Sequence, residues 1–416
     1  MIAIAGMSCH FPGAEGLDAY WRLISANRSA IGDPPAYRRE FIRQAEVLQI
    51  PVRGGYIEHE GRFDPRLFHI PEREAARMDP QQKLVLIHAC RALEDAGLTF
   101  DEIGGSRTGV FVGAMTNDLA YLKWGDVAQT LPEDITGNGL CLIANRLSYE
   151  LDLRGPSMTI DTACSSSLVA MHHAVRSLRE FECDFALVAG VNVILSTLLQ
   201  KFYRDAGVGA SDGGCRSYSR DANGMGRSEG VGVLLLQREQ DLPVRCRKSY
   251  AAVNATGVNH GGQSNRFTAP SVQAQVELLR QTYASAGIQP HEIAYVEGHG
   301  TGIQQGDLME IRALQQVFSG RDPPCWLGSI KSLIGHAEAA SGIAGVIKIA
   351  LMIHYAHIPP SAYADSPAPL LDACSPVQLM KAMRSLNPRR RHFMGVSAFG
   401  LGGTNAHALL TSHRFG

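Results

Sequence analysis

A cysteine stands where a predicted strand turns into a predicted helix. Residues 157–168 read SMTIDTACSSSL, so apolar strand residues give way to small residues and then to a helical repeat. We expect Cys164 at or next to the helix N-terminus, where unpaired N–H groups and the positive end of the helix dipole stabilise a thiolate. A thiolate attacks acyl groups. A buried structural cysteine is the alternative for this motif taken alone.

Two histidines follow two further predicted strands, and each lies beside glycine. His299 is in EGHGTG and His336 is in IGHAEAASG. Neutral imidazole N–H groups at such positions could stabilise an oxyanion or enolate, or one ring could exchange a proton near neutrality; packed or surface histidines are the alternative. The nearby Asp307, Glu310 and Lys331 could form a polar network that orients these loops, or a structural salt bridge.

A fourth segment near the C-terminus, GVSAFGLGGTNAH at 395–407, carries three glycines in four positions. Successive backbone N–H groups in such a loop can point at an anion. The segment lacks the G-x-G-x-x-G pattern and no capped helix is predicted after it, which disfavours a dinucleotide site. The G-x-S-x-G pattern at 209–213 has no strand-to-helix context, so we interpret it as a chance match.

Composition narrows the classes of function. The chain has 416 residues, 43 of them glycine, and a formal net charge of -1, which gives no global attraction to nucleic acid or to an anionic membrane. Nine cysteines occur without C-x-x-C spacing, so we expect no metal site, reduced thiols and a cytoplasmic location. No apolar run approaches the ~20 residues of a membrane span.

Short apolar runs alternate with helical patterns along the chain. The strand predictions begin with 2–6, and the helix predictions include 75–96 and 168–178, the last with a clear 3.6-residue repeat. This alternation predicts an α/β protein with largely buried strands. The irregular, basic stretch 237–248 could separate two α/β halves.

Together these segments resemble the β-ketoacyl synthase (ketosynthase) family, particularly the ketosynthases of modular polyketide synthases. The resemblance is carried in order by DTACSSSL, EGHGTG, GSIKSLIGHAEAASG and GVSAFGLGGTNAH, and it spans nearly the whole chain. It implies a thiolase-like α/β fold, with two related halves in a five-layer αβαβα arrangement, and a homodimer. Residues 1–240 would form the half with Cys164 and residues 241–416 the half with both histidines, together one ketosynthase domain.

The resemblance also implies roles for particular residues. Cys164 would accept an acyl chain from the phosphopantetheine arm of an acyl carrier protein, and His299 and His336 would assist decarboxylation of a malonyl-type extender. The backbone N–H groups of Cys164 and Phe399 would form an oxyanion hole, with Phe399 also the gatekeeper. Supporting residues would be Lys331, Glu310 and Asp307, and pantetheine contacts Thr301 and Ile303. No bound cofactor and no metal are implied.

Four positions depart from the family pattern. Ile303 replaces threonine, Leu308 proline, Leu333 asparagine and Gly298 alanine. Condensation of carrier-bound thioesters is the leading hypothesis, and a non-elongating enzyme that transfers or cyclises a chain is the second. Restoring Asn and Thr at 333 and 303 should switch on condensation under the second. The third is a non-catalytic partner resembling a chain-length factor. Because the sequence begins and ends near the core motifs, we expect a discrete enzyme or a trimmed domain.

Overall fold

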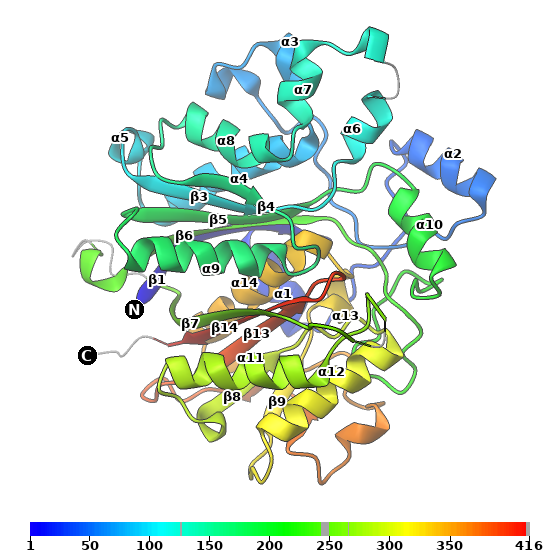
Figure 1. The fold of residues 1–416 in the computed structure, drawn as a ribbon, viewed down its shortest axis with the longest axis vertical. Coiled ribbons are helices and arrows are strands. Elements are labelled where there is room, and N and C mark those ends of the chain that lie inside the picture. Colours follow the sequence, from blue (N-terminus) through cyan, green and yellow to red (C-terminus); the bar gives the residue numbers. More distant parts are fainter. Residues whose placement is uncertain (125–126, 243–248, 265, 413–416) are drawn as a thin grey trace.

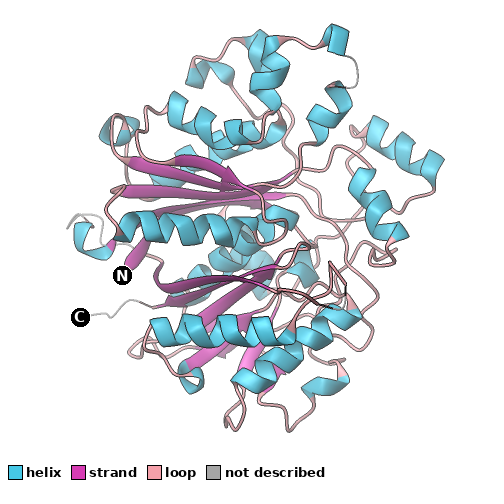
Figure 2. Ribbon diagram, viewed as in Figure 1, coloured by secondary structure: helices cyan, strands magenta, loops and turns pink. Residues whose placement is uncertain are grey.

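Strands and helices alternate through the chain in a computed structural model, which describes residues 1–124, 127–242, 249–264 and 266–412 (Figures 1 and 2). The strands of the first sheet lie in the order β1-β6-β5-β3-β4. Their bounds are β1 Ile2–Phe11, β3 Thr108–Gly113, β4 Ser157–Ile160, β5 Phe185–Asn192 and β6 Gly230–Arg238, and the short β2 (Ala14–Glu15) pairs with β1.

A second sheet repeats this strand order. It runs β7-β14-β13-β8-β9, followed by β11 at the edge. Counted along the chain within each half, and leaving the small edge strands aside, both sheets have the order 1-5-4-2-3. Strands β1 and β7 pair, so the two sheets are hydrogen-bonded to each other. The bounds are β7 Ala251–His260, β8 Ile293–Glu297, β9 Cys325–Gly328, β11 Val377–Leu379, β13 Phe393–Phe399 and β14 Thr404–Thr411.

Helices cover both sheets and fill the space between them (Figure 1). The outer layers are α4 (Pro80–Asp95) with α8 (Cys141–Glu150), and α11 (Val272–Ser285) with α12 (Gln304–Val317). In the middle layer α9 (Ser166–Arg179) and α14 (Ser341–His354) contact each other and strands of both sheets. The five-layer αβαβα arrangement is therefore confirmed.

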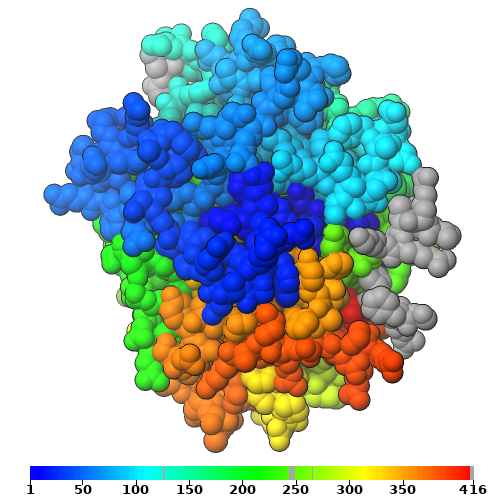
Figure 3. All heavy atoms as spheres, turned by 180° about the vertical axis from the view of Figure 1, so that it is seen from behind, coloured from blue at the N-terminus to red at the C-terminus, as the bar shows by residue number. Residues whose placement is uncertain are grey.

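The remaining elements are short and lie mostly at the periphery. Seen from behind, the N-terminal residues (dark blue) cover the middle of the molecule, between cyan residues above and orange residues below (Figure 3). The helices are α1 Leu17–Ser25, α2 Arg39–Leu48, α3 Glu72–Ala75, α5 Phe100–Ile103, α6 Asp118–Lys123, α7 Pro132–Asn138, α10 Leu198–Asp205 and α13 Lys331–Ile334. Strands β10 (His357–Ile358) and β12 (Arg384–Ser385) form a separate pair.

Some predicted bounds were wrong. The helix predicted over 75–96 is divided, because Asp79 caps α4 by accepting a hydrogen bond from the Gln81 N–H over 2.8 Å, and Pro80 is the first helical residue. The strand predicted at 2–6 continues to Phe11 as β1. The predicted boundary after residue 240 falls between β6 and β7, and part of the basic stretch, 243–248, lies outside the described residues.

The described residues also supply three observations on thiols, membranes and metals. Their eight cysteines are all free. Among their helices, none combines the length and the apolar character required to cross a membrane. Within the same residues, no three His, Cys, Asp or Glu side chains are grouped so that they could hold a metal ion.

The middle layer is packed through small residues. Helix α14 is buried from Ser341 to Met352, as expected for a helix that is apolar all round. A Cβ atom added at Gly190 of β5 would lie 2.7 Å from Cβ of Ser167 on α9 and 3.0 Å from Cγ2 of Ile343 on α14. This glycine therefore lets both central helices approach the first sheet closely.

We predict that Gly190→Ala lowers the free energy of unfolding by about 1–3 kcal/mol, because the added methyl group overpacks this contact. Urea denaturation followed by circular dichroism measures the change. The matched control is Gly306→Ala in α12, where the nearest neighbouring atom would be 4.0 Å away. That control should be neutral or stabilising by up to about 1 kcal/mol. Equal effects of the two substitutions would contradict the packing argument.

Candidate active site

The chain makes a sharp turn between β4 and α9, and Cys164 lies in it. Strand β4 ends at Ile160 and α9 begins at Ser166. Ala163, directly before the cysteine, has a φ of 56°, in the left-handed region that residues with a Cβ rarely adopt. Strained backbone of this kind clusters at functional sites, where the surrounding structure holds it in place. The turn presents Cys164 just beyond the carboxyl end of β4.

Hydroxyl and carboxylate side chains hold this turn. The Ser166 Oγ accepts a hydrogen bond from the Thr162 N–H over 2.9 Å, and the Ser165 Oγ donates to the Thr162 carbonyl over 2.8 Å. The Ala163 N–H donates to Oδ1 of Asp161 over 2.9 Å. The small and polar side chains seen in the sequence therefore form hydrogen bonds with backbone groups of the turn that have no regular secondary structure to pair with.

The thiol of Cys164 does not have the low pKa that the sequence suggested. Its residue is 6% exposed, and burial raises the pKa to about 12. The Lys331 ammonium acts in the opposite direction but more weakly. The Glu338 carboxylate also raises this pKa, and α9 begins two residues after the cysteine, at Ser166. Burial therefore opposes the thiolate that the sequence predicted at this position.

Two buried carboxylates hold the loop that contains His299. Glu310 accepts hydrogen bonds from the His299 N–H over 2.7 Å and the Gly300 N–H over 2.9 Å. Asp307 accepts one from the Thr301 N–H over 3.0 Å. Neither carboxylate forms an ion pair with any residue the structure describes. Of the two alternatives left open by the sequence, the polar network that orients the loop is the one present.

Tyr218, which the sequence analysis missed, completes this network. Its hydroxyl donates to Oε2 of Glu310 over 2.8 Å, and its N–H donates to Oδ2 of Asp307 over 2.7 Å. A Cβ added at Gly298 would lie 1.9 Å from that hydroxyl. The tyrosine thus occupies the space of an alanine methyl group, which explains the Gly298 departure. Burial raises the pKa of Asp307 to about 7 and also raises that of Glu310.

His336 lies at the position in the second half that Cys164 occupies in the first, between the third strand and the central helix. Its N–H donates to the Gly226 carbonyl over 2.8 Å, and its carbonyl accepts from the Ser228 N–H over 2.9 Å. Its ring Nδ1 accepts from the Glu338 N–H over 3.0 Å. Hydrogen bonds therefore fix both the backbone of His336 and the inner nitrogen of its ring.

A buried ion pair supports the His336 loop. The Arg227 guanidinium donates to the two carboxylate oxygens of Glu338 over 2.6 and 2.9 Å, and the two side chains are 3% and 0% exposed. Gln200 accepts a further hydrogen bond from Arg227 over 2.6 Å. The sequence analysis missed this pair, although a glutamate inside the run of small residues after His336 is a signal for a buried charge that needs a partner.

The two imidazole rings are held in the same way, through their inner nitrogen. His299 Nδ1 accepts from the Phe399 N–H over 3.3 Å, just as His336 Nδ1 accepts from a backbone N–H, so each ring carries its proton on Nε2. Burial, followed by the Lys331 charge, lowers the pKa of both rings well below 6.5. Their centroids are 5.4 Å apart. Nε2 of His336 is buried without a hydrogen-bond partner among the described residues.

The glycine-rich segment joins β13 to β14 and brings Phe399 to the same place. The Phe399 ring centroid is 5.3 Å from that of His299. A Cβ at Gly400 would lie 2.3 Å from the Thr162 carbonyl oxygen, so this loop packs directly against the cysteine turn. The hydroxyl of Ser341, at the start of α14, donates to the Cys164 carbonyl over 3.5 Å. All four sequence motifs therefore meet at one site.

Lys331 is a buried lysine beside both histidines. Burial lowers its pKa, and the carboxylates of Glu297 and Glu310 oppose that effect. Glu297 is in turn paired with Lys348 of α14 at 2.6 Å. The sequence analysis missed Glu297 and Lys348, although a single lysine within an apolar helix indicates a buried partner.

The structure also places the other predicted contacts and departures. Thr301 is buried, and its Oγ1 accepts from the Ile303 N–H over 3.3 Å. Ile303 packs against a small apolar cluster that includes Tyr203. Leu333 is part of the central hydrophobic core. Leu308 is half-buried on α12.

Comparison with known proteins identifies sequence relatives over almost the whole chain. Residues 1–242 match the family model "Beta-ketoacyl synthase, N-terminal domain", and residues 250–365 match "Beta-ketoacyl synthase, C-terminal domain". The chain is 40% identical to a phenolphthiocerol/phthiocerol polyketide synthase of Mycobacterium tuberculosis, over 98% of this chain and 22% of that protein. It is 39% identical to erythronolide synthase EryA3 of Saccharopolyspora erythraea, over 98% and 13%. The chain thus spans about a fifth or less of these relatives' lengths.

Solved structures of ketosynthases also resemble this chain over almost its whole length. The ketosynthase from module 6 of the bacillaene synthase of Bacillus subtilis 168 superposes with a TM-score of 0.90 at 35% identity, over 99% of this chain and 72% of that one. The oxazolomycin ketosynthase domain OzmH KS7 of Streptomyces albus JA3453 has a TM-score of 0.92 at 34% identity, over 99% and 75%.

The neutral state of His336 predicts a pH effect on stability. An unfolded imidazole takes up a proton as the pH falls below about 6.5, whereas the folded one resists it because its pKa is lowered. The stability that the neutral ring contributes is therefore fully present above pH 6.5. It is lost as the pH falls through that value towards the pKa of the folded state. From pH 7.5 to 5.5, the unfolding free energy of His336→Asn should fall by about 1.4 kcal/mol less than that of the parent.

Urea denaturation at the two pH values measures this difference. The matched control is His291→Asn, which removes an imidazole from an exposed position instead of a buried one. An identical pH dependence in His336→Asn and the parent would contradict the neutral, buried assignment.

Proposed function

The chain belongs to the β-ketoacyl synthase family, and from this membership we propose that it is a polyketide ketosynthase. It transfers an acyl group from an acyl carrier protein to Cys164 and condenses that group with a malonyl-type extender, with loss of carbon dioxide. One observation carries the proposal: the cysteine turn, the paired imidazoles and the Phe399 loop meet at one buried site. The substrates arrive on the phosphopantetheine of the carrier, and no resident cofactor takes part.

The first step is compatible with a neutral thiol. The sulfur of Cys164 forms a bond to the thioester carbon, the carbon–sulfur bond to the carrier breaks, and the thiol proton ends on the departing pantetheine sulfur. Because no proton is gained or lost overall, the thiolate is needed only transiently. The N–H groups of Cys164 and Phe399 are the proposed donors to the oxyanion that forms between bond making and bond breaking. The Phe399 N–H would share its hydrogen between this oxyanion and Nδ1 of His299, which it contacts over a long 3.3 Å.

The second step uses the two imidazoles. Cleavage of the malonyl carbon–carbon bond releases carbon dioxide and leaves an enolate, whose oxygen accepts hydrogen bonds from Nε2 of His299 and His336. The enolate carbon attacks the acyl carbon, the bond to the Cys164 sulfur breaks, and the β-ketoacyl product remains on the carrier. The released thiolate then takes up one proton, which its raised pKa favours.

Other residues position these groups. Residues 1–240 supply the nucleophile and residues 241–416 both histidines, so the site lies between the halves of one ketosynthase domain. Glu310, Asp307 and Lys331 act as positioning residues for the histidine loops. Thr301 and Ile303 flank the pantetheine arm, and Phe399 acts as the gate between the two substrates.

No observation specifically favours the two alternative functions. Leu333 packs in the central core and Ile303 in an apolar cluster, so both departures take part in packing. The chemistry of a non-elongating enzyme would end after the first step, and a partner resembling a chain-length factor would perform neither. The same measurement therefore separates all three.

Mass spectrometry of the purified chain incubated with a butyryl-carrier should show a butyryl adduct on Cys164. Addition of malonyl-carrier should then give a β-ketoacyl-carrier product. Cys164→Ala should lose both signals, whereas Cys141→Ala, at an exposed cysteine, should lose neither. An adduct without product would overturn elongation and favour the second hypothesis, and the absence of an adduct would overturn the proposal.

We further propose that the chain forms a homodimer through the outer edge of β4. Strand β4 pairs only with β3 among the described residues, so its other side offers free backbone groups for a second copy. Met158 on this edge is 37% exposed. Several other large apolar side chains are exposed in the same half: Tyr121, Leu122, Trp124, Val127, Leu131 and Ile135. Exposed apolar groups in such number are typical of an interface.

Met158→Asp should convert the dimer to a monomer, because two carboxylates would face each other across the paired edges. Sedimentation velocity measures the mass. The control, Phe100→Asp, changes an exposed apolar residue on α5 and should leave the dimer intact. A monomeric parent would refute the dimer, and a dimeric Met158→Asp would refute this edge.

A further inference from the structure

A surface hollow lies beside the loop that contains the predicted pantetheine contacts. Its volume is about 280 Å³. Its lining is largely apolar, with Leu308 of α12 and, from a short 3-10 helix and its cap, Ala368 and Leu370. Arg220 and Arg312 also line it. The hollow therefore combines an apolar floor with two cations.

Neither arginine is neutralised by the protein. In the described part of the chain, no carboxylate lies within ion-pairing distance of Arg220 or Arg312, and both residues are exposed. Asp307 also lines the hollow, but its oxygens accept hydrogen bonds from backbone N–H groups of three residues. Helix α12 adds positive potential, since it begins at the hollow without a side-chain cap. This charge is thus available to an acidic partner.

The hollow also lies next to the segments that lead to the candidate active site. Gln304 lines it and directly follows Ile303, the last predicted arm contact. Ser219 lines it and directly follows Tyr218, which binds the two carboxylates of the His299 loop. A macromolecule seated here would stand next to the segment that its prosthetic arm must pass.

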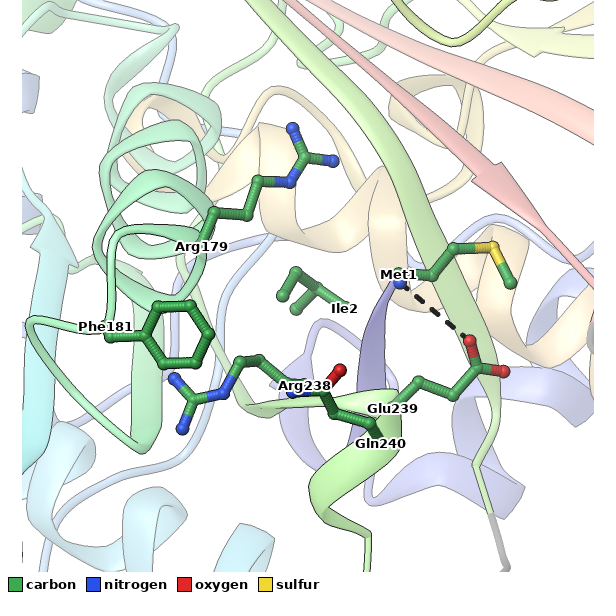
Figure 4. Close-up of a pocket in the computed structure, with 7 residues that line it drawn as sticks. All are labelled: Met1, Ile2, Arg179, Phe181, Arg238, Glu239 and Gln240. Carbon is green, nitrogen blue, oxygen red and sulfur yellow. Dashed lines mark ion pairs between the residues drawn. The ribbon is translucent and has the colours of Figure 1, made fainter.

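A larger hollow, of about 540 Å³, does not share this position (Figure 4). It is lined by Arg179, the last residue of α9, whereas Cys164 precedes the first residue of that helix, about 20 Å away. Its second arginine, Arg238, is already paired with Asp184 and lies against the Phe181 ring. Its place and its paired charge make it unsuitable for delivery to Cys164.

We propose that the hollow between Arg220 and Arg312 is the docking surface for the acidic face of the acyl carrier protein. Carboxylates of the carrier pair with the two guanidinium groups, while an apolar carrier side chain enters over Leu308. Complementary charge at an exposed rim acts mainly on the rate of encounter and on partner choice. The inference rests on the proposed function, because that function makes a carrier protein the partner.

The test compares the double variant Arg220→Glu/Arg312→Glu with the parent protein. Acylation of each protein is measured with three butyryl donors. These donors are butyryl-carrier, butyryl-phosphopantetheine, which has the arm and its phosphate, and butyryl-N-acetylcysteamine, which has neither carrier nor phosphate. In the variant we expect KM for butyryl-carrier to rise by about tenfold or more, with kcat unchanged. We also expect this KM to depend less on salt concentration in the variant than in the parent. Acylation by both small donors should not change.

Two further variants control for charge and for folding. Arg220→Lys/Arg312→Lys keeps both charges and should stay within about twofold of the parent, because complementary charge at an exposed rim acts on the encounter with the partner. Arg389→Glu/Arg390→Glu reverses two exposed charges at the amino end of β13, opposite to Phe399, and should have no effect. If the Glu variant does not fold, Arg220→Gln/Arg312→Gln replaces it, with a smaller expected rise in KM.

Each other outcome overturns the proposal. An unchanged KM for butyryl-carrier, or an equal rise in the Arg389/Arg390 variant, removes the docking surface. A rise for butyryl-phosphopantetheine would assign the arginines to the arm's phosphate instead. Binding of the apo-carrier, which lacks the arm, is measured separately by fluorescence anisotropy. It should weaken in the Glu variant even if Cys164 is never acylated, so failure of the docking surface and failure of the proposed function are distinguishable.

Discussion

The close contact between α9 and α14 is the constraint on which the site depends. A Cβ at Gly342 of α14 would lie 2.8 Å from Oγ of Ser167 on α9, and that same hydroxyl accepts a hydrogen bond from the Ile343 N–H over 3.1 Å. The two helices begin side by side, because each follows the third strand of its own half. The residues before them, Cys164 and His336, are brought together from positions far apart in the sequence. A repeated topology therefore becomes one asymmetric site.

This proximity requires the protein to bury ionisable groups close to the site, and two of the carboxylates are offset by a paired cation. Glu338 is held by Arg227, and Glu297 by Lys348. Buried pairs of this kind contribute little net stability, but the removal of one partner typically costs about 3–5 kcal/mol. Their value here is geometric. Glu338 donates its N–H to the ring of His336, and Glu297 accepts the Ile330 N–H directly before Lys331.

The sequence predicted the fold class and the four segments that meet at the site. These segments could be recognised because glycine and small residues cluster where backbone must approach backbone. The same reasoning could not predict the state of the thiol. A helix N-terminus after Cys164 favours a thiolate, but burial has the larger effect, and burial comes from the packing of the second half. Nor could it find Tyr218, since a single tyrosine in an irregular loop carries no periodic signal. Its role is visible only through the space it fills beside Gly298.

That pairing of Tyr218 with Gly298 bears on how the departures from the family pattern should be judged. A missing methyl group would leave a gap beside Glu310, but the tyrosine hydroxyl fills it and adds a hydrogen bond to the carboxylate that fixes His299. Leu333 likewise replaces a polar side chain with one that the core contacts on all sides. At these two positions the departure from the family pattern is matched by the neighbouring side chains. The carboxylate of Glu310 therefore keeps its hold on the His299 loop although the methyl group of the family pattern is absent.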